Sequence, residues 1–359
     1  MRSYDTILVG LGLAGGCLAW AHQARGSELL VIDREESVTA SRIAAGLVTP
    51  VTGQRLVKTW RLDEFYPCAR DFYRWVEIET GVAFFHELPA VRLFVDDNER
   101  ACYEKRQSSP SYAGMFAPID RWPASMPAPF GGVELVPAAR LDVAQFLQVT
   151  REHLRSRQCY RAGELQLPQD VQLIHDGVEL PAWGVRARHL IFCQGYAAHA
   201  NPWFQGFAWN PAKGEILIVA IPGHEEPRIV HRGIWIAPTG MKNASGDRLY
   251  RVGATYDWSR LDQVPTPHGR EELEQRLASS LTVPFHVVGH DAAIRPILKN
   301  LNPVIGCLPE HPAIGFMNGL GSKGSLLAPY FSQQLTGHLL EGIPLEPAVD
   351  FSIRRGQGG

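Results

Sequence analysis

The sequence predicts an α/β fold in which a parallel sheet is joined to a second, mainly antiparallel sheet. Three observations lead to this prediction. Residues 5–33 read as strand, glycine turn, helix and strand; residues 201–294 hold mainly short strands separated by turn residues; and residues 313–341 read as strand, glycine turn and helix. A chain of 359 residues is long enough for two domains of about 150 residues each, or for one elaborated domain.

The first element is a strand, because Thr6–Val9 is a short continuous apolar run of the kind found in sheets buried on both faces. A glycine turn follows at residues 10–15, and a helix continues from Cys17 to Ala24 until Gly26 ends it. Leu29–Ile32 is the second buried strand.

The next segments alternate between loops and amphipathic helices. Residues 41–53 form a loop of small residues, and residues 63–80 place Phe65, Phe72 and Val76 on one helical stripe. Residues 108–132 are rich in proline and glycine and predict a covering loop. Further helices are predicted at 141–157, 268–281 and Ser325–Glu341, and strands at 171–175, 188–193, Glu215–Ile221, Ile229–Ile236, Leu249–Ala254 and Ala313–Met317.

Charge and composition narrow the classes of function. The chain has 35 basic and 37 acidic residues, and 45% of its residues are hydrophobic. This composition is typical of a globular protein and unlike that of a disordered chain. Because the net charge is only −2, we expect no capture of nucleic acid or of an anionic membrane by the molecule as a whole.

Targeting signals and metal motifs are not evident in the sequence. The longest glycine-plus-apolar stretch, Ile7–Ala21, is shorter than the roughly 18 residues of a membrane span, and it lacks the features of a signal peptide. The six cysteines form no CxxC pair and the thirteen histidines form no HExxH arrangement. We therefore expect a soluble, cytoplasmic protein without a bound metal or a disulfide framework.

The first glycine turn predicts a dinucleotide site. Gly10 allows the tight turn, Gly12 leaves room for a pyrophosphate, and Gly15 lets the helix pack closely on the strand. The helix N-terminus favours phosphate, and Asp33 at the end of the second strand can accept hydrogen bonds from a ribose. This motif alone does not separate FAD from NAD.

A second glycine turn, residues 319–324, favours a flavin. It lies between a strand and the C-terminal helix, so it places backbone amides and Lys323 at a helix start. Such a site would stabilise the negative charge of a reduced flavin. The alternative is that this turn only lets the strand and helix pack closely and binds no ligand.

Four separated parts of the chain resemble the D-amino-acid oxidase/glycine oxidase family of FAD-dependent amine oxidoreductases. They are DTILVGLGLAGGCLAW with LLVID; SRIAAGLVTP at 41–50; RVGATYDW at 251–258; and AIRPILKNLNPVIG followed by GFMNGLGSKGSLLAP. The resemblance implies a Rossmann-like FAD-binding domain that is discontinuous in sequence, and a mainly antiparallel β-sheet substrate domain. The implied boundaries are 1–80, 140–200 and 290–359 for the first domain, and 81–139 and 201–289 for the second.

The resemblance also implies which residues bind the cofactor. The pyrophosphate and ribose would contact the first glycine turn and the end of the second strand, the flavin would lie near the loop after residue 40, and the last glycine turn would lie beside the isoalloxazine ring. The residues so implied are Gly10, Gly12, Ala14, Gly15, Asp33, Arg34, Ser41, Arg42, Ala44, Ala45, Gly46, Gly195, Gly319, Leu320, Gly321, Ser322, Lys323 and Gly324.

Three side chains are candidates for the chemistry itself: Arg295, Tyr256 and Lys323. Arg295 matches the arginine that binds the substrate carboxylate in amino-acid-oxidising members. This role suits a planar guanidinium, which can donate two parallel hydrogen bonds to a carboxylate. Its alternative role is an ordinary salt bridge with a core acid. Tyr256 could bond a carboxylate or an amine, and its alternative is a core tyrosine on a strand.

The sequence departs from the family pattern in several places. Asp33 replaces the commoner glutamate, the triplet at 213–215 reads Lys-Gly-Glu where Arg-Gly-Gln is frequent, residues 297–302 lack the usual threonine and acid, and Lys323 stands where smaller or aromatic residues are common. No cysteine or histidine lies at 317–330 and His22 lies in the first helix. We therefore expect FAD to be bound without a covalent link.

The expected chemistry is oxidation of a C–N bond in a small amino acid or secondary amine. A hydride passes to flavin N5 and leaves an imine that water hydrolyses, a reaction that depends on positioning more than on an acid or base. Oxygen or an electron carrier would be the acceptor.

Two other functions stay open. One is modification of a carboxymethylaminomethyl group at the wobble uridine of tRNA, as in the flavin half of a bacterial bifunctional enzyme. Against it stand the lack of a methyltransferase half and of a basic stripe. The other is a flavin-binding protein without turnover.

Overall fold

The N-terminal segment forms the predicted strand, helix and strand. In a computed structural model, β1 (Arg2–Val9), α1 (Leu13–Gln23) and β2 (Leu29–Asp33) follow one another, and β1 pairs in parallel with β2. The residues of β2 from Leu29 to Ile32 are fully buried, as expected of a strand covered on both faces. The structure describes residues 1–205, 207–299 and 302–354.

The first sheet contains eight strands. Their order is β11-β2-β1-β14-β13-β12, with β21 paired to β14 and β20 paired to β21. The pairings of β11, β2, β1, β14 and β21 with one another are parallel, whereas β12, β13 and β20 add antiparallel edges. The strands beyond β2 are β11 (Tyr160–Ala162), β12 (Gln172–Ile174), β13 (Gly177–Leu180), β14 (Val185–Phe192), β20 (Val304–Leu308) and β21 (His311–Asn318).

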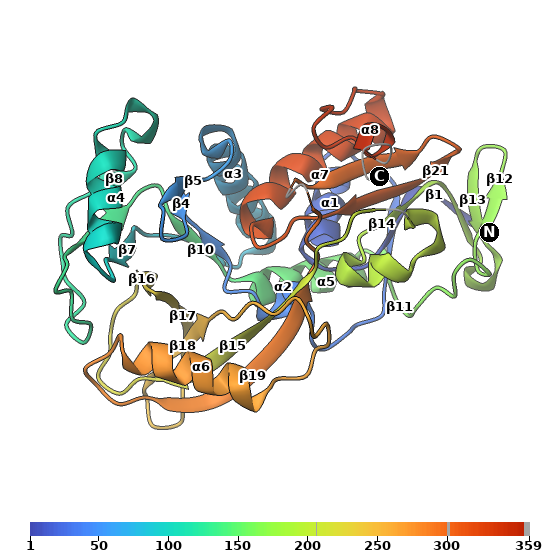
Figure 1. Ribbon diagram of the computed structural model, residues 1–359. Helices are drawn as coiled ribbons and strands as arrows, with labels where there is room; N and C mark the ends of the chain where they lie inside the picture. The colour runs from blue at the N-terminus through green and yellow to red at the C-terminus, as the bar shows by residue number, and fades with distance from the viewer. Residues whose placement is uncertain (206, 300–301, 355–359) are drawn as a thin grey trace.

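Helices pack on this sheet and on one another (Figure 1). Contacts join α1 to α7 (Gly324–Glu341) and to α5 (Val143–Ser156), and α7 to α3 (Leu62–Thr80). These four helices agree with the helices predicted from the sequence, including the ends of α3 and α7 at Gly81 and Gly342.

The second sheet also has eight strands and is mainly antiparallel. Its order is β19-β15-β18-β17-β16-β7-β9-β8, and only the β16–β7 pairing is parallel. The strands are β7 (Ala90–Leu93), β8 (Phe116–Ala117), β9 (Gly132–Leu135), β15 (Ala212–Ala220), β16 (Val230–Arg232), β17 (Ile234–Lys242), β18 (Arg248–Gly253) and β19 (His286–Arg295). The predicted fold class, a parallel sheet joined to an antiparallel one, is confirmed. The proposed domain boundaries stay a prediction.

One predicted strand is wrong. Residues 229–236 were expected to run as a single strand, but the chain reverses at Gly233, whose φ is +65°. The segment therefore forms two antiparallel strands, β16 and β17, in which Arg232 pairs with Ile234. Buried apolar residues lie on both sides of the turn, Val230 before it and Ile234 after it, so hydrophobicity alone does not mark the reversal.

The two faces of the second sheet have different neighbours. Leu217 and Val219 of β15 pack with Leu273 and Leu277 of α6 (Pro267–Ala278), in one apolar cluster. Alternate residues of a strand point to opposite faces, so Gly214 and Ile216 face away from α6 and toward the first sheet. This inward face is the one that borders the cavity described below.

Several short elements complete the chain. They include a helix that the sequence did not predict, α4 (Asp97–Gln107), whose polar residues give no apolar stripe but whose first turn is capped by Asp96. Within the predicted covering loop, residues 116–117 join the second sheet as its edge strand. The remaining elements are α2 (Ala40–Ile43), β3 (Leu47–Val48), β4 (Val51–Thr52), β5 (Val57–Lys58), β6 (Phe85–Glu87), α4 (Asp97–Gln107), β10 (Ala139–Leu141), α8 (Phe351–Arg354) and the 3-10 helices Pro110–Tyr112, Pro181–Trp183, Gly195–Ala200 and Pro202–Phe204.

Among the described residues, every helix is too short or too polar to cross a membrane.

Candidate active site

The first glycine turn ends at an open helix N-terminus. Gly10 has φ +103°, and a Cβ there would lie 2.7 Å from the Cys193 carbonyl oxygen; a Cβ at Gly15 would lie 2.0 Å from the Gly10 oxygen. Close packing therefore explains these two glycines. A Cβ at Gly12 would meet only the Ser41 hydroxyl, at 3.2 Å. The backbone around Gly12 does not demand a glycine, and the position leaves space on the cavity side.

The same turn presents backbone donors to the cavity. No side chain caps α1 at Gly12, and the first amides of a helix have no intrahelical acceptor. The Leu13 amide donates to Ser41 Oγ at 3.1 Å, which brings the loop after residue 40 against the turn. This arrangement is suited to a phosphate group.

Asp33 holds the turn from the end of β2. Its carboxylate accepts hydrogen bonds from the Leu11 amide at 2.7 Å and from the Glu35 amide at 2.9 Å. Each carboxylate oxygen can accept more than one bond, so capacity remains for a ribose. The neighbouring Arg34 lies at the rim, where it forms ion pairs with Glu36 and Glu164.

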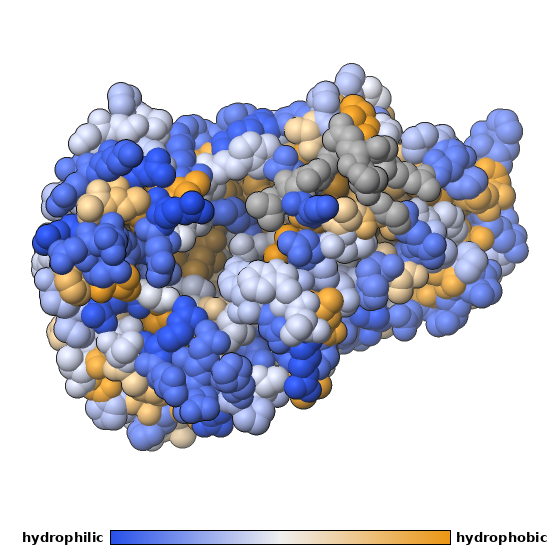
Figure 2. Space-filling model, viewed as in Figure 1, coloured by the Kyte–Doolittle hydropathy of each residue, from blue (hydrophilic) through white to orange (hydrophobic). Residues whose placement is uncertain are grey.

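A large cavity lies between the two sheets. Its volume is about 1010 Å³, at the upper end of the roughly 300–1,000 Å³ of ligand pockets. Figure 2 shows a hollow near the middle of the molecular face, with hydrophobic residues in its wall. The predicted residues that line the cavity are Gly10, Gly12, Ala14, Asp33, Arg34, Ser41, Arg42, Ala44, Ala45, Gly46, Gly195, Tyr256, Arg295, Leu320, Gly321, Ser322, Lys323 and Gly324.

Two predicted residues lie just outside this lining, Gly15 and Gly319. Gly15 packs against Gly10, and Gly319 adopts φ +77° with Leu298 beside it. Both glycines serve close packing behind the turns. The predicted departure at 297–302 extends over residues 300 and 301, which lie outside the described residues.

The second glycine turn brings another helix start to the cavity. α7 begins after Lys323 without a side-chain cap. The Lys323 ammonium donates to Thr59 Oγ1 at 3.0 Å and has no carboxylate partner in the described ranges. Burial without a counter-charge lowers the pKa of Lys323 to about 8.

Arg295 ends β19 with its guanidinium in the cavity. Its Nη1 donates weakly to the carbonyl oxygens of Lys213 and Thr255, at 3.4 and 3.3 Å. Nowhere in residues 1–205, 207–299 and 302–354 does a carboxylate form an ion pair with it, so the alternative of a salt bridge with a core acid is not found there. Burial lowers the pKa of Arg295 below its ordinary value.

Tyr256 and Gly214 enclose this arginine. The Tyr256 ring centroid lies 4.1 Å from the guanidinium carbon, a cation–π distance. Tyr256 is 49% exposed, so it is not a core tyrosine. A Cβ at Gly214 would lie 2.1–2.3 Å from the guanidinium atoms. Arg295 therefore occupies the space that a side chain at position 214 would fill.

The sequence reasoning missed the role of the 213–215 triplet. It flagged the triplet only as a departure from a family pattern, although Lys213 and Glu215 are both buried and Gly214 lies against Arg295. The available signal was a lysine and a glutamate two residues apart at the start of the predicted strand Glu215–Ile221, because buried charges need partners. No cluster of three or more potential metal ligands occurs in the part of the chain that the structure describes.

Residues 5–337 match the family described as FAD dependent oxidoreductase, DAO. The chain belongs to this family. A match over almost the whole chain explains the two glycine turns and implies FAD as the cofactor. The uncapped start of α1, the open position of Gly12 and the size of the cavity fit that group.

The chain is similar to proteins with different stated activities. It is 27% identical over 344 residues to the tRNA 5-methylaminomethyl-2-thiouridine biosynthesis bifunctional protein MnmC of Maricaulis maris, covering 94% of this chain and 52% of that protein. The chain thus spans about half the length of this relative.

Solved structures share the fold. Glycine oxidase from Geobacillus kaustophilus has a TM-score of 0.77 and 19% identity, over 96% of each chain. Iminodiacetate oxidase from Chelativorans sp. BNC1 has a TM-score of 0.73 and 20% identity, over 95% of this chain and 96% of that one. At these identities the likeness concerns the fold alone.

Proposed function

We propose that the protein oxidises a C–N bond in a small amino acid or secondary amine that carries a carboxylate. One observation carries this proposal: the Arg295 guanidinium lies in the cavity, partly buried and without a carboxylate partner among the described residues. A buried charge without a partner is costly, and a ligand carboxylate would remove that cost through two parallel charge-assisted bonds.

The neighbours of Arg295 suit the reaction. The Tyr256 ring covers one face of the guanidinium and leaves its edge for the ligand. Ile216, Trp235 and Ala293 give the adjoining wall an apolar character, which excludes water and favours a neutral amine. Bound FAD supplies the acceptor for the hydride that leaves the α-carbon.

The cofactor site is proposed on the two glycine turns. The turn at residues 10–15 and Asp33 would hold the pyrophosphate and ribose, and the start of α7 with Lys323 would lie near the flavin. Cys193 lines the cavity, but burial raises the pKa of its thiol to about 12. Such a thiol is a poor nucleophile, which supports FAD bound without a covalent link. Acid precipitation should release all the flavin into solution.

A second candidate, tRNA modification, is favoured by the similarity to MnmC over 94% of this chain. A carboxymethylaminomethyl group on uridine also carries a carboxylate and a secondary amine, so Arg295 suits it as well. Binding of tRNA at low salt, lost as salt rises, would favour this candidate.

The deciding experiment is an anaerobic titration of the purified protein followed by its absorption spectrum. Glycine, iminodiacetate, proline and N-methylated amino acids are added in turn. Bleaching of the flavin by one of them establishes amine oxidation and identifies a substrate. If none of them bleaches the flavin, the proposal is contradicted. The remaining alternatives are then a tRNA-modifying enzyme and a flavin-binding protein without turnover.

A further inference from the structure

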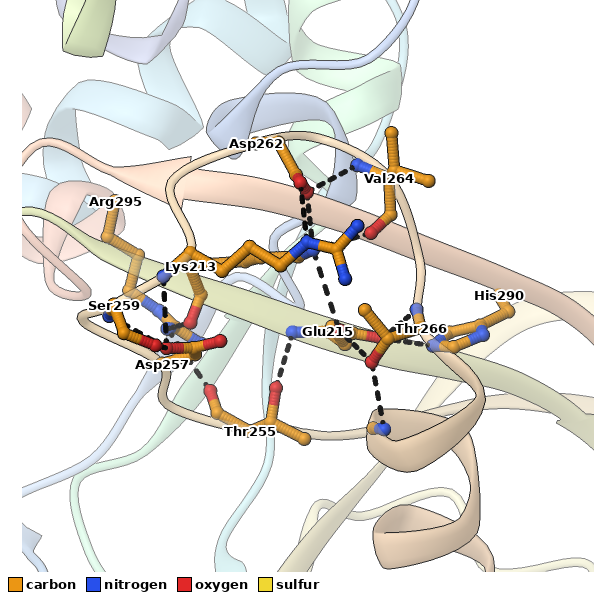
Figure 3. Close-up of polar contacts among 12 residues, drawn as sticks. Lys213, Glu215, Thr255, Asp257, Ser259, Asp262, Val264, Thr266, His290 and Arg295 are labelled. Atoms are coloured by element: carbon orange, nitrogen blue, oxygen red, sulfur yellow. Dashed lines mark hydrogen bonds and ion pairs between the residues drawn. The ribbon is translucent and has the colours of Figure 1, made fainter.

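Lys213 is a fully buried lysine outside the cavity lining. It lies on β15 with its side chain 0% exposed. Its ammonium forms an ion pair with Asp262 at 2.5 Å and donates to the carbonyl oxygen of Val264. Both partners belong to the connection between β18 and α6, drawn in Figure 3. Residues 255–266 of this connection are called the anchored segment below.

Glu215 holds the same segment two residues farther along β15. Its carboxylate accepts hydrogen bonds from the Thr266 amide at 2.9 Å and the Thr266 hydroxyl at 2.8 Å, and lies 2.8 Å from His290 Nε2 (Figure 3). Thr266 in turn caps α6 by accepting from the Gly269 amide. The C-terminal end of the anchored segment is therefore fixed by two buried charges on one face of β15.

The N-terminal end is fixed by backbone. The Lys213 amide donates to the Asp257 oxygen at 2.8 Å, and the Asp257 amide donates to the Lys213 oxygen at 3.0 Å. The Glu215 amide donates to Thr255 Oγ1 at 2.9 Å. Tyr256 thus lies between two residues that β15 holds directly.

The contacts of the Arg295 guanidinium that the structure describes come from β15 and the anchored segment. The carbonyl oxygens of Lys213 and Thr255 accept from Nη1, Gly214 leaves the space, and the Tyr256 ring lies on the guanidinium. Release of the anchored segment would free the ring and one of the two acceptors together.

We propose that Lys213 is a positioning residue: by binding Asp262 and Val264, it holds the anchored segment so that Tyr256 and Thr255 orient Arg295 for a ligand carboxylate. Lys213 itself does not reach the ligand. The inference rests on the proposed function only in taking a carboxylate as the ligand of Arg295.

The test uses the FAD-loaded protein, with acetate as the probe and acetamide as its neutral counterpart, and reads binding from the change in the flavin absorption spectrum. Lys213→Met and Asp262→Ala break the same ion pair from its two ends. Arg260→Ala is the matched control, because Arg260 is 58% exposed and pairs with the other oxygen of Asp262. Flavin content and thermal unfolding are recorded for every variant.

We expect Lys213→Met and Asp262→Ala to weaken acetate at least tenfold while acetamide binding changes little. Lys213→Arg should restore most of the affinity, and Arg260→Ala should behave like the parent. In an Arg295→Ala background, Lys213→Met should cause no further loss of acetate affinity, because the guanidinium through which Lys213 acts is already absent. The double-mutant cycle measures this coupling. A general loss of stability would not give this pattern.

Two failures are distinguishable. If Arg295→Ala alone leaves acetate affinity unchanged, the carboxylate site of the proposed function is wrong. If Arg295→Ala abolishes acetate binding but Asp262→Ala and Lys213→Met bind acetate like the parent, the positioning role of Lys213 is overturned. Should Lys213→Met not retain FAD, Asp262→Ala decides, since Asp262 is 36% exposed and lies outside β15, and Glu215 still lies 3.8 Å from the Lys213 ammonium.

Discussion

Gly214→Ala should displace Arg295 without disturbing the fold. Gly214 lies on β15 diagonally across from Arg295 on β19, and its φ is not in the left-handed region. The backbone therefore accepts alanine, and this kind of substitution stabilises a fold by about 0.4–1 kcal/mol through the unfolded chain. The new Cβ would lie 2.1 Å from Arg295 Nη2 and 2.3 Å from Cζ and Nη1. Because the guanidinium is the end of a flexible side chain, it moves and the strand stays.

The size of the effect follows from the overlap. Carbon and nitrogen atoms in contact need roughly 3.5 Å, so the guanidinium must shift by about 1 Å or more. A misplacement of about 1 Å in a positioning group costs on the order of 100-fold in rate. We therefore expect kcat/KM for a carboxylate substrate to fall about 100-fold, equivalent to about 2.7 kcal/mol.

The assay is anaerobic flavin reduction at increasing substrate concentration, together with FAD content and thermal unfolding. Gly289→Ala is the matched control, because the atoms nearest to a Cβ there belong to the Ile218 side chain, the closest at 3.2 Å. Gly289 is a glycine of β19 outside the cavity lining. The reasoning is refuted if Gly214→Ala keeps its FAD and oxidises the carboxylate substrate with unchanged kcat/KM.

Three further outcomes are expected. Arg295→Ala should retain FAD but weaken carboxylate substrates by roughly 2–4 kcal/mol; steady-state kinetics would check this, and equal KM values would remove Arg295 from the site. Gly12→Val should yield folded protein without flavin, because its side chain fills the pyrophosphate position; circular dichroism and flavin content test both halves. Burial lowers the pKa of Lys323 from 10.5 to about 8. Between these two pH values the unfolded chain binds more protons than the folded one, so this lysine makes the free energy of unfolding rise with pH across that window. Lys323→Met should flatten that rise in unfolding experiments. It should also remove any change in the rate of flavin reduction near pH 8. An unchanged dependence of stability on pH in the variant would contradict the lowered pKa of Lys323.

The parallel sheet and its helices were predictable because their signals are local. The apolar run of β1, the glycine turn and the stop of α1 all lie within about 20 residues, and each reports backbone geometry directly. The reversal at Gly233 was not predicted from the same signals, because a single glycine between two short β-rich segments does not by itself distinguish a turn from a strand interior.

The candidate site divides in the same way. The predicted turns and Asp33 line the cavity because helix starts and strand ends place their amides and side chains according to local chain direction. The confinement of Arg295 depends instead on strand register: Ala212 pairs with Arg295 and Gly214 with Ala293, which puts the glycine beside the guanidinium.

The amino-acid sequence by itself determined the family, the two glycine turns and the arginine at the end of β19, since these are carried by residue type and short spacing. Tertiary structure alone decided that Lys213 is buried, that Tyr256 covers Arg295, and that Asp262 compensates the lysine's charge. Residues 213, 256 and 295 are far apart in the chain and meet only when β15, β19 and the anchored segment are assembled. Their chemistry depends on burial and on neighbours, which spacing along a chain does not specify.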